Sequence, residues 1–455
     1  MNSAWHEIDR YLIGEAWAGS RIGAHLKKLC DEIGPRWASS AQEWQTIGYI
    51  REQLAACGLD AVDVEEYEMD TWSWSAAGAT LEDGRELDLL PTIWCPSFDI
   101  EAPVVDAGFG TAREIAGAAG LRGSIAVMAL AQAPFATPSP HAYRLRNLAA
   151  AGAAAAVLID VKEGGRKEYH SAHDLADPDF TGPPLPAVTV SREEGQLLRR
   201  NAGARLRLRA GTDTGRARSA NVVGELRSAG AAGEHLVLGA HHDTVYGAPG
   251  GNDNTSGVIA VLETARVLAS LRSETGESPG CSLRFVTYSA EEQRFQGSFA
   301  FVGRHYGHEK PPRLALNLDE LSTGHMKGVV LGFPHLQPLL QRQLDGMGEG
   351  HRCHVMSQLD ASSDHFPYLK AGLDAGHLWR WRFAGRHGDS DFHHEPGDSA
   401  DKLNVRELKE YVAHLARLLL RLSRVPAAEW PPNPVTPQEV AARLQRERGS
   451  VVRVF

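Results

Sequence analysis

Two histidines and four acidic residues stand out because their side chains could hold metal ions and move a proton. In chain order they are His241, Asp253, Glu291, Glu292, Asp319 and His394. Each falls where a predicted strand runs out into a loop. Two imidazoles with three carboxylates suit a pair of zinc ions that share one bridging carboxylate, with the cations about 3.5 to 4 Å apart. The sequence therefore predicts a two-metal hydrolytic site.

Each motif has a plainer interpretation when it is taken alone. Asp243 is placed to accept the second ring N–H of His241 and fix its tautomer, but a His-x-Asp triplet in a loop is usually a solvated turn. Glu291 and Glu292 should repel each other unless a cation relieves them, although a Glu pair also suits the start of a helix. Asp253 could be only a turn residue. Their joint occurrence at strand ends, where open α/β sheets bind ligands, favours the metal site.

Alternating strands and helices must position these side chains. Most expected strands are continuous apolar runs, which is the pattern of an α/β sheet covered by helices on both faces. Expected strands include 61–67, 236–239 and 283–288, and expected helices include 40–58, 256–270 and 405–422. After Trp72, Pro, Gly and Ala become dense, and 123–130, 154–159 and 186–190 predict short buried strands. This stretch is expected to be an insertion with its own core.

Composition and charge indicate which partners and which cellular location to expect. The chain has 455 residues, with 47 basic and 57 acidic side chains and a net charge of -10, so no nucleic-acid or membrane partner is expected. Residues 1–19 lack the apolar core of a signal peptide, and five scattered cysteines argue mildly against a disulfide framework. We expect a cytoplasmic protein with a peptide or dipeptide substrate, and a homodimer is left open.

A resemblance to a known family rests on the order of the motifs. They are His241-x-Asp243, Asp253-Asn254-x-Ser256-Gly257, Glu291-Glu292, Asp319 and His394-x-Pro396-x-Asp398. This series resembles the double-zinc aminopeptidase family, which includes bacterial leucyl aminopeptidase and, more distantly, glutamate carboxypeptidase and the transferrin receptor. Residues 123–127 and 145–159 resemble the protease-associated domain, a small β-rich module found beside peptidase active sites.

The resemblance implies both a fold and a division of the chain. The fold is α/β, a mostly parallel mixed sheet sandwiched by helices, of the zinc-exopeptidase and phosphorylase/hydrolase-like class, with an inserted small β-rich protease-associated domain. The expected division is 1–85 and 213–424 for the two parts of the peptidase domain, 86–212 for the insertion, and 425–455 for a Pro-rich C-terminal tail with a short helix.

The resemblance also implies a role for each site residue. Five positions bind two zinc ions, with other divalent metals left open: Asp253 bridges them, His241 and Asp319 complete one site, and Glu292 and His394 complete the other. Glu291 is the general base, and Asp243 belongs with it to the catalytic group. Glu291 then takes a proton from water and returns it to the leaving amine.

The implied activity is that of a zinc-dependent exopeptidase, with an aminopeptidase as the first hypothesis. A metallo-dipeptidase or carboxypeptidase is the rival, since the Trp and Arg residues of 379–382 could bind a substrate carboxylate or could form a half-buried strand. Asp364 and His365 are candidate pocket residues or a helix cap and its neighbour. Retention of both metal sets disfavours a glutaminyl-cyclase-like acyltransferase and a non-catalytic peptidase-like binding protein.

Overall fold

The computed structural model describes residues 3–172, 182–228, 230, 233–321, 325–348, 353–378, 391–451 and 453. The α-helices are α1 (Ser3–Ala18), α2 (Ile22–Leu26), α3 (Ala41–Ala56), α4 (Ala112–Gly117), α5 (His141–Ala150), α6 (Arg192–Arg200), α7 (Ser256–Thr275), α8 (Gln296–His305), α9 (Gln337–Asp345), α10 (His365–Lys370), α11 (Val405–Ser423) and α12 (Pro437–Arg446). Shorter π or 3-10 segments are η1 (Lys27–Ile33), η2 (Gly251–Thr255), η3 (Pro334–Leu336), η5 (Ala400–Lys402) and η6 (Ala427–Glu429).

The described strands form one continuous hydrogen-bonded sheet, and the first two lie outside its linear order. They are β1 (Ala61–Leu81), β2 (Glu86–Leu87), β3 (Leu89–Pro91), β4 (Phe98–Asp106), β5 (Ile125–Ala129), β6 (Ala155–Ile159), β7 (Ala187–Val190), β8 (Arg205–Leu226), β9 (His235–His241), β10 (Ser282–Tyr288), β11 (Ala315–Asn317), β12 (Gly328–Leu331), β13 (His354–Ser357) and β14 (Ala375–Leu378). Their order is β13-β12-β14-β11-β9-β10-β8-β4-β5-β6-β7-β3, with β1 paired to β2 and β8.

The strands that carry the site lie side by side and run in the same direction. β9 pairs in parallel with β10 on one side and with β11 on the other, and β11 pairs in parallel with β14. The carboxyl ends of parallel neighbours meet at one edge of the sheet. The loops after β9, β10 and β11 therefore open at the same place.

Helices cover both faces of this part of the sheet, because buried side chains along its strands alternate between two cores. On β9, Leu236 and Leu238 pack into a core with side chains of α1, α3, α7 and α11, whereas Val237 packs into a core with α8, α10 and α12. Successive strand side chains point to opposite faces, so a strand buried on both sides needs apolar residues throughout. The predicted α/β sandwich is confirmed.

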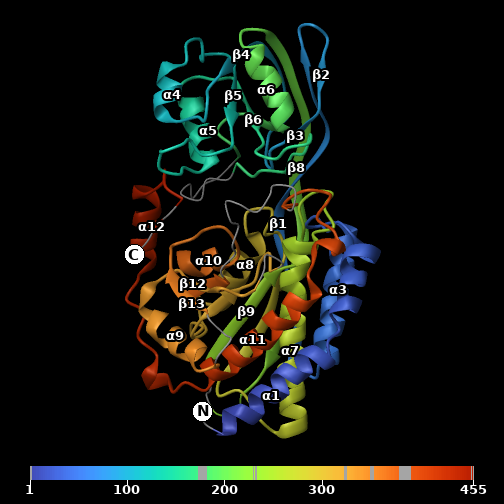
Figure 1. The fold of residues 1–455 in the computed structure, drawn as a ribbon, viewed down its shortest axis with the longest axis vertical. Coiled ribbons are helices and arrows are strands. Elements are labelled where there is room, and N and C mark those ends of the chain that lie inside the picture. The colour runs from blue at the N-terminus through green and yellow to red at the C-terminus, as the bar shows by residue number, and fades with distance from the viewer. Residues whose placement is uncertain are drawn as a thin grey trace.

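Two long strands connect this part of the molecule to a second, smaller one. β1 and β8 pair in antiparallel register from Ala61 opposite Glu225 to Leu81 opposite Leu206, and Figure 1 shows both running between the two parts. β8 pairs with β10 near its end and with β4 near its start. The strand expected at 61–67 is much longer than predicted because β8 supplies a partner along its whole length. The division near residues 85 and 212 stays a proposal.

The smaller part has its own core, as expected for the insertion. β4, β5, β6 and β7 are parallel neighbours, and every residue of β5, β6 and β7 is buried. Leu198 of α6 packs on one face of these strands, and Leu145 and Leu148 of α5 pack on the other. The C-terminal α12 instead belongs to the larger part, where Val440 and Leu444 are buried in the second core.

Among the described helices, none is both long enough and apolar enough to span a bilayer.

A buried histidine at the start of β9 should make the fold sensitive to acid. His235 is 4% exposed, and its ring is stacked on Tyr306. Burial, with a contribution from Arg284, lowers the pKa of His235 to about 4. Because the unfolded chain takes up this proton near pH 6.5, stability that is present above pH 6.5 is lost as the pH falls towards 4, by up to about 3 kcal/mol. When the pH is lowered from 7.5 to 4.5, the thermal midpoint of unfolding should fall less for His235→Phe than for the parent protein.

The matched control for this change is His354→Phe, because His354 lies exposed on β13. The control should follow the parent protein at both pH values. An equal loss in all three proteins would show that His235 makes no contribution to the acid sensitivity.

Candidate metal centre

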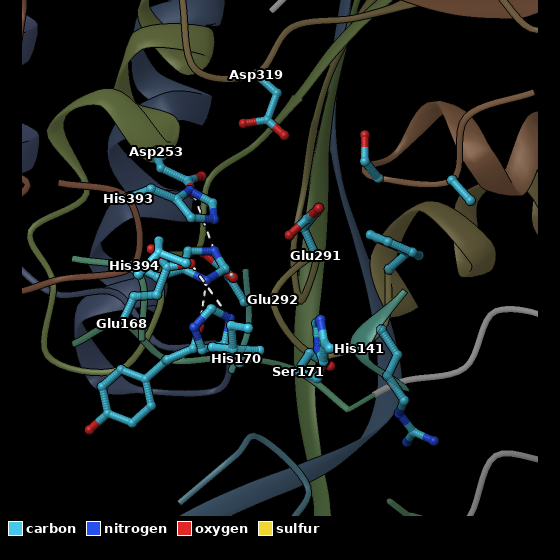
Figure 2. Close-up of a pocket in the computed structure, with 17 residues that line it drawn as sticks. His141, Glu168, His170, Ser171, Asp253, Glu291, Glu292, Asp319, His393 and His394 are labelled. Atoms are coloured by element: carbon cyan, nitrogen blue, oxygen red, sulfur yellow. Dashed lines mark hydrogen bonds and ion pairs between the residues drawn. The ribbon is translucent and has the colours of Figure 1, made fainter. Parts of the chain in front are cut away.

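The residues predicted to bind metal converge at the edge of the sheet where β9, β10 and β11 end. His241 is the last residue of β9, Glu291 and Glu292 follow β10, and Asp319 follows β11. Asp253 lies in η2, immediately before the long buried helix α7. Figure 2 shows Asp253, Glu291, Glu292, Asp319 and His394 around one cavity. The loop of 391–399 thus brings His394 to Asp253 and Glu292, which lie more than a hundred residues earlier in the chain.

Asp253 stands between two groups of donor atoms. Its Oδ1 lies 3.2 Å from His241 Nε2, which is 3.5 Å from Asp319 Oδ1. Its Oδ2 lies 3.3 Å from His394 Nε2, which is 3.1 Å from Glu292 Oε2. One carboxylate therefore presents a separate oxygen to each group.

These separations fit a pair of cations. Two ligands about 2.0 to 2.1 Å from a tetrahedral zinc ion are about 3.3 Å apart. His241 Nε2 and Glu292 Oε1 are buried and have no hydrogen-bond partner among the residues that the structure describes. Buried polar atoms are normally satisfied, so these atoms point to a ligand that the protein binds. The donor set fits two metal ions that share Asp253.

Backbone carbonyls fix the tautomers of both histidines. His241 Nδ1 lies 3.1 Å from the carbonyl oxygen of Asp243, and His394 Nδ1 lies 2.8 Å from that of Tyr169. A carbonyl oxygen only accepts, so each Nδ1 carries the proton and each Nε2 presents a lone pair. Tyr169 belongs to the insertion, which therefore orients a ligand carried by the larger part.

The Asp243 carboxylate lies beside the His241 ring, as predicted, and also contacts the turn after β10. Its Oδ1 is 3.5 Å from His241 Nδ1, farther than the Asp243 backbone oxygen. The carboxylate also accepts hydrogen bonds from the backbone N–H groups of Glu291 (3.1 Å) and Glu292 (3.3 Å). Asp243 thus holds the turn after β10 against the loop after β9.

Asp398 and Arg36 hold the neighbouring loops. The Asp398 carboxylate accepts from the backbone N–H groups of Asn252 (2.8 Å) and Asp253 (2.9 Å), and burial raises the pKa of Asp398 to about 7. Arg36 is fully buried and donates to the His242 carbonyl (2.9 Å). Asp398 was part of the predicted motif. Arg36 was not identified, because a single arginine after Gly-Pro carries no signal of the loops that it will contact.

Glu291 belongs to neither group of close donors and is free to act on protons. It lines the cavity beside Glu292 and Asp319. Burial raises the pKa of Glu291 well above its usual range, and the two neighbouring carboxylates add to this effect while His241 opposes it. A carboxylate with a raised pKa is suited to hold a proton between two steps of a reaction.

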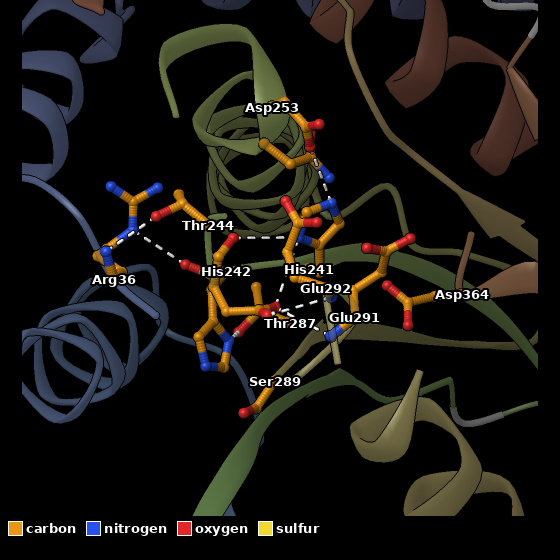
Figure 3. Close-up of polar contacts among 12 residues, drawn as sticks. Arg36, His241, His242, Thr244, Asp253, Thr287, Ser289, Glu291, Glu292 and Asp364 are labelled. Atoms are coloured by element: carbon orange, nitrogen blue, oxygen red, sulfur yellow. Dashed lines mark hydrogen bonds and ion pairs between the residues drawn. The ribbon is translucent and has the colours of Figure 1, made fainter. Parts of the chain in front are cut away.

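Asp364 reaches this site, and His365 lies behind it. Figure 3 shows Asp364 facing Glu291. Ser298 Oγ donates to Asp364 Oδ1 at 2.5 Å, and burial raises the pKa of Asp364 to about 7. Although Asp364 is the N-cap residue of α10, its side chain makes no capping hydrogen bond. The Asp364 side chain thus does not act as the predicted cap. Its role in the pocket stays a prediction, because Asp364 is 0% exposed, His365 is 2% exposed, and neither is among the residues that line the cavity.

The insertion forms one wall of the cavity, which has a volume of about 500 Å³. Its contributions are Leu130, His141, Val161, Glu168, Tyr169, His170 and Ser171. His393 also lines the cavity, with Nδ1 2.9 Å from Asp253 Oδ2. These wall residues were not predicted from the sequence, because they belong to no recognisable motif. The predicted Trp-Arg segment of 379–382 lies outside the described residues.

A buried lysine of the insertion contacts the loop that carries His394. Lys162 Nζ donates to the His393 carbonyl (2.8 Å) and pairs with Glu168 and Glu395. Burial alone would lower the pKa of Lys162, but the two carboxylates outweigh it and that pKa is raised. Lys162→Met should weaken zinc binding by about 10- to 100-fold, the usual cost of losing a residue that supports a metal ligand. Titration with a zinc chelator measures this change.

Lys167→Met is the control for Lys162. It also lies on the insertion, but its partner Asp88 is exposed. Equal zinc affinity in the two variants would contradict a supporting role for Lys162.

Comparison with known proteins defines the class. Residues 221–419 match peptidase family M28 and residues 100–198 match the PA domain. The resemblance seen in the motifs is confirmed: residues 221–419 of the larger part match peptidase family M28, and the insertion contains a match to the PA domain.

Individual proteins also resemble this chain in sequence or in fold. Aminopeptidase YwaD of Bacillus subtilis is 26% identical over 405 residues, which cover 85% of this chain and 80% of that protein. The structure of BSAP, a zinc aminopeptidase from Bacillus subtilis, has a TM-score of 0.68 at 22% identity and covers 91% of this chain and 97% of that one. A peptidase M28 precursor from Shewanella amazonensis has a TM-score of 0.74 at 20% identity, with 96% and 100% covered. The shared fold extends over both parts of the molecule.

Proposed function

We propose that this protein is a zinc-dependent aminopeptidase, which removes the N-terminal residue from peptides. The observation that carries the proposal is the position of Asp253, whose two oxygens face separate groups of nitrogen and oxygen donors. In this assignment Asp253 would help to hold both zinc ions, together with His241 and Asp319 for one ion and with Glu292 and His394 for the other. Zinc ions bound there would supply an activated water and polarise the scissile carbonyl.

Glu291 is the general base in this proposal. It takes the proton from the attacking water and passes it to the nitrogen of the leaving peptide as the bond breaks. Asp243 keeps Glu291 in place through its backbone N–H, and the carbonyls of Asp243 and Tyr169 keep the two imidazoles turned towards the centre.

The wall formed by the insertion favours an aminopeptidase. Glu168 lines the cavity with a side chain that is 12% exposed. Burial would raise the pKa of Glu168, but His170 and Lys162 help to outweigh it and hold that pKa below its usual range. Glu168 Oε2 is paired with Lys162, so the attraction for the ammonium group of a free N-terminus rests on Oε1, which lies 3.5 Å from His170 Nδ1. The names of the relatives agree with this choice.

A matched set of substrates tests the activity. The zinc-loaded protein should cleave a free tripeptide and its C-amidated form, and acetylation of the N-terminus should abolish cleavage. This result is expected because only the acetylated peptide lacks the charged amine. Hydrolysis is followed by release of the first residue.

The same set separates the rival activity. Loss of cleavage on amidation, or cleavage of the corresponding dipeptide alone, would contradict the proposal and favour a carboxypeptidase or dipeptidase. Absence of cleavage of every member of the set would contradict the peptidase assignment itself.

A further inference from the structure

A second cluster of histidine and aspartate side chains lies outside the peptidase centre. Asp360 lies in the segment before α10, His365 begins α10, and His377 lies on β14. One possible ligand atom from each of the three residues lies within 4.8 Å of the other two. None of these residues is among the five proposed zinc ligands. The cluster therefore needs an explanation of its own.

The His377 ring is fixed so that one nitrogen faces the carboxylate. Its Nδ1 lies 2.8 Å from the carbonyl oxygen of Leu378, so Nδ1 carries the proton and Nε2 presents a lone pair. The same arrangement orients His241 and His394. All three imidazoles thus present Nε2 as a ligand atom.

His377 Nε2 lies close to the Asp360 carboxylate, whose Oδ2 accepts a hydrogen bond from Ser362 Oγ (2.8 Å). The distance to Asp360 Oδ2 is 3.0 Å, yet Nε2 is buried and has no hydrogen-bond partner in the described part of the chain. His377 as a whole is 7% exposed. A cation that contacts both atoms would satisfy them. Because His335 Nε2 lies in the same way 3.2 Å from Asp374 Oδ1, the pair alone is not sufficient, and the third donor distinguishes this cluster. His241 Nε2 and Asp253 Oδ1 show the same signature at the peptidase centre, at 3.2 Å.

His365 completes a set of ligands that zinc prefers. Its ring centroid lies 4.6 Å from that of His377, and its side chain is buried. Two imidazoles and one carboxylate form a common zinc site with one position left for water. Ligands of a tetrahedral zinc ion are about 3.3 Å apart, close to the separation of His377 Nε2 and Asp360 Oδ2.

We propose that Asp360, His365 and His377 bind a third divalent cation of the zinc class, with a structural role. Two of its ligands bracket the segment that contains Ala361 and Ser362, which line the catalytic cavity, and Asp364, which faces Glu291. The cation ties this segment to β14 through His377. It therefore holds a part of the cavity wall that the insertion does not form, without taking part in the reaction.

Metal content per chain tests this proposal. After removal of metals and dialysis against Zn²⁺, the full-length protein should bind three equivalents by elemental analysis, and His377→Leu should bind two. His335→Leu is the matched control and should bind three. His335 also pairs with an acid, Asp374 at 3.2 Å, but belongs to no group of three such donors among the described residues.

Two equivalents in both the parent protein and His377→Leu would overturn the proposal. If His377→Leu does not fold, anomalous scattering from crystals of the parent protein at the zinc edge decides the question: a peak between Asp360, His365 and His377 supports the site, and its absence refutes it. Failure of the peptidase centre is distinguishable, because it would remove the two ions at Asp253 and leave this peak in place.

Discussion

Glu291→Gln should lower kcat for a peptide substrate by about 10²- to 10⁴-fold, the usual contribution of a general base. Glutamine has nearly the same shape as glutamate, but its amide cannot accept and return the proton. Because Glu291 belongs to neither group of metal donors, zinc content should equal that of the parent protein. Steady-state hydrolysis and elemental analysis on the same preparation measure both quantities.

An exposed glutamate provides the control for this change. Glu86→Gln, on the exposed side of β2, removes one carboxylate without touching the site and should keep full activity. A Glu291→Gln protein that loses zinc together with activity would identify Glu291 as a ligand. An unchanged kcat would exclude it as the base.

Asp253→Asn should remove both zinc ions of the peptidase centre and abolish hydrolysis, the largest effect that we expect from a single substitution. Each Asp253 oxygen faces a different donor group, at 3.2 Å from His241 and 3.3 Å from His394. An amide offers only one oxygen and no negative charge, so neither the bridge nor the charge balance survives. Elemental analysis should show a loss of two equivalents per chain.

Asp319→Asn is the comparison that isolates the bridge. Asp319 belongs to the donor group of His241 and not to that of His394, so its substitution should release one ion and leave the ion held by Glu292 and His394. Equal zinc losses in the two variants would contradict the assignment of Asp253 as the shared ligand.

Much of the site could be predicted because its residues follow apolar strands. The run that ends at His241 and the run that precedes Glu291 are recognisable as buried parallel strands, and parallel strands end at one edge of the sheet. The sequence thus predicted which side chains would meet before any distance was known. Asp398 could also be identified from the sequence, because it lies in the motif that contains His394.

Other parts of the site depend on contacts that no local pattern encodes. Tyr169 orients His394 through its backbone carbonyl. Every residue type carries this group, so the identity of residue 169 gives no signal in the sequence. Lys162 and Glu168 resemble ordinary charged residues of a loop until the insertion is placed against the loop of His394.

The sequence by itself determined the fold class, the strand ends at which the site residues lie, and the chemistry that those residues can perform. Apolar periodicity sets secondary structure, and the residue types set the ligands. Only the tertiary structure decided that β1 and β8 extend into the insertion, that the insertion forms a wall of the cavity, and that Asp360, His365 and His377 meet. These features depend on pairing and packing between distant segments, which the local sequence does not specify.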